Sequence, residues 1–139
     1  MYRFLDRAVR DLEPGNQILV WSMRSWVAAI AQGRCTCAAL GPAFFRWRLG
    51  DLLGDFNMMM FLLNGEGQTG LRFAPPECGL VRDDEAMLLA MFHAGAVGDG
   101  AVLQRFAAQL VTPQAEEPFR IAVVNAADVL RRSPLPRTR

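Results

Sequence analysis

Three cysteines and the only histidine are the residues best suited to hold a metal ion. Cys35 and Cys37 are separated by one residue, Cys78 lies in a segment rich in Gly and Pro, and His93 follows it. Three thiolates and one imidazole would complete a tetrahedral zinc site. However, the Cys-x-Cys spacing is shorter than is usual for a pair of zinc ligands, and the four residues are far apart in the chain. We therefore expect ordinary reduced cysteines and no cofactor, with a zinc-binding or thiol-based regulatory protein as the alternative.

Catalytic schemes are sharply limited by the composition. Any acid–base or triad mechanism that uses histidine depends on His93, whose neighbours Phe92 and Ala94 favour a packed or rim position. All 15 basic residues are Arg. The absence of Lys excludes P-loop, protein kinase and Schiff-base chemistry. Arg in place of Lys, with abundant Ala and Gly, is typical of a GC-rich and bacterial gene. Because no motif in the sequence indicates a specific reaction, we expect a protein without enzymatic activity.

The segment Gly65-Glu66-Gly67-Gln68-Thr69-Gly70 has the spacing of a dinucleotide-binding fingerprint. That fingerprint needs a strand before the turn and a helix after it. Here the preceding residues have a helical pattern, and Pro75-Pro76 prevents a helix from following. The match is therefore interpreted as part of a flexible loop.

Charge and hydropathy indicate neither a nucleic acid nor a membrane partner. The net charge is +1, which provides no broad positive field for a phosphate backbone. The longest apolar segment, 18–31, is shorter than the roughly 20 residues that a membrane span needs, and it contains Arg24. The first residues mix both charges and contain no apolar core, so we expect no secretory signal and a cytoplasmic location.

Length and periodicity predict one all-α domain. The 139 residues are 52% apolar and 21% charged, which suits a single globular domain. Apolar residues recur at helical spacing, so the sequence predicts a compact bundle of five or six helices over residues 1–132, followed by a flexible Arg/Pro tail, 133–139. The expected helices span 2–12, 16–32, 42–63, a segment from Asp83 to Gly95 or Gly98, about 100–111 and 118–132. One long Gly/Pro-rich loop, 64–82, separates the third helix from the fourth.

Large apolar side chains are more numerous than a small domain readily buries. Such an excess usually marks a surface that contacts another protein. We expect the second helix or the Met-rich end of the third to supply the contact. The candidate interface residues are Trp21, Trp26, Met58 and Met59. The main functional hypothesis is a cytoplasmic helical protein that forms a homodimer or binds a protein partner.

Overall fold

Helices account for nearly all the regular structure in the computed structural model, which describes residues 4–67 and 70–134. Within those residues there are six α-helices and two short 3-10 helices. The elements, in chain order, are η1 (Val9–Asp11), α1 (Pro14–Ala31), α2 (Thr36–Arg46), α3 (Gly50–Glu66), α4 (Asp83–Val97), α5 (Gly100–Leu110), η2 (Pro113–Ala115) and α6 (Glu116–Arg132). This arrangement confirms the predicted all-α bundle.

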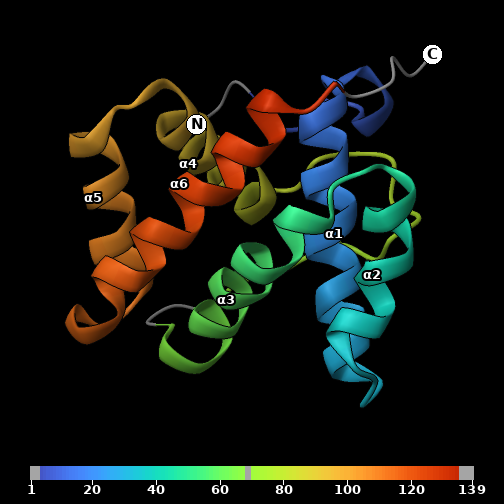
Figure 1. The fold of residues 1–139 in the computed structure, drawn as a ribbon, viewed down its shortest axis with the longest axis horizontal. Coiled ribbons are helices and arrows are strands. Elements are labelled where there is room, and N and C mark those ends of the chain that lie inside the picture. The colour runs from blue at the N-terminus through green and yellow to red at the C-terminus, as the bar shows by residue number, and fades with distance from the viewer. Residues whose placement is uncertain (1–3, 68–69, 135–139) are drawn as a thin grey trace.

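The helices pack around α3 and α6, which make the most extensive contact in the fold. Figure 1 shows α4 and α5 on one side of α6, and α1 and α2 on the other side of α3. The core between them is built from fully buried large side chains. These include Trp26, Phe44, Phe56, Met59, Leu88 and Phe119. Among the parts of the chain that the structure describes, none of the helices has both the length and the apolar character needed to cross a membrane.

The predicted first helix, 2–12, is wrong within the part that the structure describes. Only the short turn η1 is helical there, and Ala8 forms an isolated bridge with Leu80. The Asp6 N–H donates to the Val81 carbonyl at 3.0 Å, and the Val9 N–H donates to the Gly79 carbonyl at 2.8 Å. These bonds to a distant segment satisfy backbone groups that a helix would otherwise pair locally. Pro14 does not stop a helix but begins α1, at the position where a missing N–H costs nothing.

The predicted third helix, 42–63, is two helices joined by a tight turn. The first of them, α2, already begins at Thr36 and contains Pro42, and it ends before Arg48, which has a left-handed φ of 59°. The Leu49 N–H returns to the Phe44 carbonyl at 2.7 Å, which closes the end of α2. Helices commonly end in this way with Gly in the left-handed position. Arg occupies it here, so the sequence carries no obvious signal for the break.

The other predicted helices are confirmed with small shifts of their ends. Gly33 follows α1 and Gly98 ends α4, both with positive φ. The Asp99 carboxylate accepts from the Val102 N–H at 3.2 Å and caps α5. The predicted loop, 64–82, begins too early, because residues 64–66 belong to the end of α3, while residues 70–82 contain no helix. Residues 68–69 of the glycine motif and 135–139 of the predicted tail lie outside the described residues.

Candidate interaction surface

Helix α3 is held in place by contacts on three of its sides. Its inner side is buried against the bundle, through Leu52, Phe56, Met59 and Met60. The two flanking sides are fixed by hydrogen bonds that Asn57 and Asp55 accept. The fourth side faces outward.

Asn57 joins α3 to both α1 and α2. Its Oδ1 atom accepts hydrogen bonds from Trp26 Nε1 at 2.8 Å and from Thr36 Oγ1 at 2.9 Å. Trp26 and Thr36 are buried, so without Asn57 their donors would lack a partner. This side chain sets the position of α3 relative to two other helices.

On the other flank, α3 is bonded to α6 and to the turn that precedes α6. Asn125 Nδ2 donates to Asp55 Oδ1 at 3.4 Å, and Thr112 Oγ1 donates to Glu66 Oε1 at 2.9 Å. The start of α3 therefore meets the middle of α6, and its end meets the segment before α6, so the two helices run in opposite directions.

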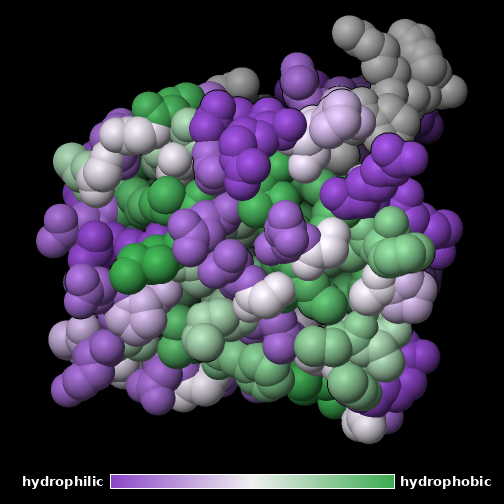
Figure 2. Space-filling model, in the orientation of Figure 1, coloured by the Kyte–Doolittle hydropathy of each residue, from purple (hydrophilic) through white to green (hydrophobic). Residues whose placement is uncertain are grey.

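The outward side of α3 carries the α3 stripe, which we define as Gly54, Met58, Phe61 and Gly65. The successive spacings of four, three and four residues place all four on one narrow face of a helix. Met58 is 51% exposed and Phe61 is 48% exposed. A Cβ atom added at either glycine would meet nothing within 4 Å, so both positions open to solvent. Figure 2 shows mostly white and green residues over the lower half of α3, beside the largely purple surface of α6.

Further exposed apolar side chains flank the stripe. Ile30, at the end of α1, is 39% exposed. Trp26 on the same helix packs edge-on against Phe61, with ring centroids 5.3 Å apart. On α6, Ile121 and Val124 are exposed, and Val124 lines a hollow beside the end of α4.

The structure changes the list of candidate interface residues. Met58 is exposed, as an interface residue must be, and Trp21 is half-buried against Trp47, with ring centroids 5.3 Å apart. Trp26 and Met59 are buried in the core and present no surface, which corrects their assignment. Sequence reasoning missed Phe61, although its spacing from Gly54 and Met58 on one helical face was a usable signal.

The predicted metal ligands are not gathered into one site. Cys35 and Cys37 are exposed at the start of α2, Cys78 is half-buried in the 70–82 loop, and His93 is exposed on α4. Within residues 4–67 and 70–134, no three His, Cys, Asp or Glu side chains are grouped so that they could hold a metal ion. The four residues that could have formed a zinc site are therefore separate surface or loop residues in this structure.

A buried ion pair between Arg24 and Glu85 holds the long loop against the bundle. Arg24 Nε and Nη2 donate to the two Glu85 carboxylate oxygens, each at 2.8 Å. Two further guanidinium N–H groups reach the loop, because Nη1 donates to the Cys78 carbonyl at 2.6 Å and Nη2 to the Leu80 carbonyl at 2.7 Å. The Glu85 carboxylate in turn accepts from the Ala74 N–H at 2.9 Å. Ala74, Cys78 and Leu80 of the loop are thus all hydrogen-bonded to this one ion pair.

The electrostatics of this pair favour its charged form. Burial acts to raise the pKa of Glu85, but hydrogen bonds from Arg24 and from the backbone N–H groups of Arg82 and Ala74 outweigh burial and lower the pKa. The hydrogen bond to Glu85 raises the pKa of Arg24 in spite of burial. The two charges neutralise each other, and the carbonyls of Cys78 and Leu80 are bound to Arg24. We therefore interpret the Arg24–Glu85 pair as a structural clamp that joins α1, α4 and the loop.

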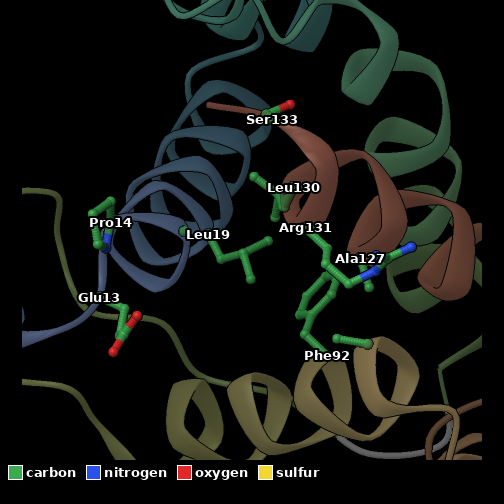
Figure 3. Close-up of a pocket in the computed structure, with 10 residues that line it drawn as sticks. Glu13, Pro14, Leu19, Phe92, Ala127, Leu130, Arg131 and Ser133 are labelled. Atoms are coloured by element: carbon green, nitrogen blue, oxygen red, sulfur yellow. The ribbon is translucent and has the colours of Figure 1, made fainter. Parts of the chain in front are cut away.

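A pocket of about 480 Å³ lies where the start of α1, α4 and the end of α6 come together. Figure 3 shows Leu19, Phe92 and Leu130 pointing into it, with Glu13 and Arg131 on opposite sides. Arg131 is already paired with Asp128. The residues that line this pocket offer an apolar floor and two charges at the rim, and no nucleophile–base pair is among them.

No protein-family model matches this chain, and no curated protein or solved structure is detectably similar to it.

Proposed function

We propose that this protein is a non-enzymatic, homo-oligomerising helical module that associates through the α3 stripe. The observation that carries the proposal is the exposure of Met58 and Phe61, side by side on a helix whose other sides are fixed by core packing and hydrogen bonds. Two large, half-exposed apolar side chains on one face of a helix are typical of a contact surface.

The energetics support association. Full burial of a Met or Phe side chain contributes about 1.5–3 kcal/mol. Met58 and Phe61 are each about half exposed, so covering both contributes on the order of 1.5–3 kcal/mol per chain. Since α3 is rigidly anchored, little backbone order has to be gained on binding. Its fixed position makes the stripe a preformed surface.

The three cysteines are free thiols, in keeping with action in the reducing cytoplasm. In our proposal they take no part in the contact, because none of them lies on α3.

Size-exclusion chromatography with light scattering tests the proposal with two single variants. Met58→Glu places a charge at the centre of the α3 stripe, and we expect it to give a monomer while the wild type is a dimer. Phe45→Glu is the matched control, because Phe45 is 83% exposed but lies on α2. Circular dichroism should be the same for all three proteins. A wild-type monomer, or a Met58→Glu variant that associates as the wild type does, would overturn the proposal.

A further inference from the structure

The pocket at the start of α1 has an apolar floor. Five side chains from α1, α4 and α6 form that floor, namely Leu19, Phe92, Ala96, Ala127 and Leu130. Its volume is about 480 Å³. Sites for small molecules typically combine a volume in this range with mostly apolar walls and a few polar groups at defined positions. The charged residues at the rim therefore indicate which ligand the pocket fits.

Glu13 supplies an unpaired negative charge on one side of the pocket. It directly precedes the first residue of α1, but its side chain makes no capping hydrogen bond to that helix. In the part of the chain that the structure describes, no ion pair involves Glu13. Its exposed carboxylate is therefore free to pair with a cationic group that enters the pocket.

Arg131, on the opposite side of the pocket, is one of two guanidinium groups that share a single carboxylate (Figure 3). Asp128 accepts from Arg131 Nη2 and also from Arg132 Nε, the latter at 2.8 Å. Two positive charges thus face one negative charge. If Arg131 turns toward the pocket, Asp128 keeps Arg132 as its partner. The cost of that movement is small, because exposed ion pairs contribute little to stability.

We infer that this pocket binds a small linear zwitterion, which is a hydrocarbon chain with an ammonium group at one end and a carboxylate at the other. The ammonium group pairs with Glu13. The carboxylate pairs with Arg131, whose guanidinium can donate to both oxygens at once. The inference does not rest on the proposed function, because α3 contributes none of the described residues that line the pocket.

The floor favours a hydrocarbon chain over a peptide between the two charges. Its five side chains are those of Leu, Phe and Ala, which contain no hydrogen-bonding group. Ser133, at the edge, already donates its hydroxyl to the Val129 carbonyl at 2.7 Å. An amide bond placed on this floor would lose its hydrogen bonds to water without replacement. Methylene groups lose no hydrogen bonds and gain free energy when they leave water.

Calorimetric titration with three probes of equal chain length tests the site. The first probe, ω-aminooctanoate, carries both charges, whereas octanoate carries only the carboxylate and octylamine only the ammonium group. Glu13→Gln should weaken the binding of ω-aminooctanoate and octylamine about two- to fivefold, as expected for partly exposed ion pairs, and should not weaken the binding of octanoate. Arg131→Gln should weaken the binding of ω-aminooctanoate and octanoate to a similar extent and should not weaken the binding of octylamine.

Three further variants serve as controls, with circular dichroism to check their folding. Glu117→Gln and Arg105→Gln remove exposed charges outside the pocket lining and should leave all three affinities unchanged. Ala96→Phe fills the pocket from α4 and should abolish the binding of every probe. If no probe binds the wild type, or if the Glu13 and Arg131 variants bind ω-aminooctanoate as the wild type does, the inference is overturned. Tighter binding of dileucine than of ω-aminooctanoate would also overturn it.

Discussion

Arg24 and Glu85 form a bidentate ion pair between two helices, with both nitrogen–oxygen distances at 2.8 Å, and the pair contacts the non-helical loop, 70–82. The two residues are 61 positions apart in sequence, on α1 and α4. Their contacts with the carbonyls of Cys78 and Leu80 place the loop over the side of the bundle. The N-terminal segment then pairs with the loop, through Ala8 and Leu80.

Arg24→Met should release the loop and lower the stability of the whole domain. The change leaves the Glu85 carboxylate buried without its partner, which typically costs about 3–5 kcal/mol. Denaturant unfolding measures the loss, and hydrogen exchange should speed up at the Ala74 amide. Asp128→Asn is the control, because it breaks exposed ion pairs and should leave both readouts unchanged. Unaltered exchange at Ala74 would refute the clamp.

Lowering the pH should reduce the contribution of the Arg24–Glu85 pair to the free energy of unfolding. The direction of this change follows from the lowered pKa of Glu85. The folded state lowers the pKa of Glu85 from its ordinary value of 4.5. Its stabilising contribution is therefore fully present above pH 4.5 and is lost as the pH falls through the folded pKa. Glu85→Gln lacks this titration. The difference in unfolding free energy between wild type and Glu85→Gln should shrink as the pH drops, and a constant difference would contradict the account.

Asn57 should be needed as an acceptor and not merely as a polar residue. Asn57→Ala leaves the buried Trp26 N–H and the Thr36 hydroxyl without their acceptor, at a cost of about 1–3 kcal/mol for each unsatisfied group. Asn57→Asp keeps an oxygen that accepts from both donors. Thermal and denaturant unfolding should therefore show a larger loss for Ala than for Asp. Equal losses would mean that the two hydrogen bonds do not position α3.

Gly54→Arg should separate folding from association. Glycine inside a helix costs up to about 1 kcal/mol relative to good helix formers. Since the position opens to solvent, Arg should stabilise the isolated chain. In the proposed assembly, however, the long charged side chain would lie within the contact surface and oppose association. Light scattering should show that this variant is a monomer. Its unfolding midpoint should be higher than that of the wild type when both are measured at a concentration where the wild type is also monomeric. A stable dimer of this variant would argue against the α3 stripe.

Sequence periodicity correctly predicts the helices that have a common end signal, such as Gly after the last turn or Asp before the first. Gly33, Gly98 and Asp99 end or cap helices as their residue types predict. Periodicity gave wrong predictions where contacts between distant parts of the chain determine the backbone conformation. The N-terminal segment has a helical sequence pattern, but in the structure it pairs with the loop through Ala8 and Leu80. Arg48 has a left-handed backbone conformation that is more typical of Gly.

The candidate surface was only partly predictable for a related reason. The composition indicated an excess of large apolar residues, and Met58 is one of the predicted interface residues that the structure leaves exposed. Which of them remain exposed depends on how α3 is rotated in the bundle, and Asn57 and Asp55 fix that rotation through partners 31 and 70 residues away along the chain. Trp26 is buried by this arrangement, whereas Phe61 is left half exposed.

Sedimentation equilibrium of the wild-type protein, from nanomolar to high micromolar concentration, tests the central claim most directly. A chain of 15.4 kDa that forms the proposed dimer should give a mass that rises with concentration and levels off at twice that value. A mass that stays at 15.4 kDa throughout, or one that continues to rise beyond the dimer, would contradict it.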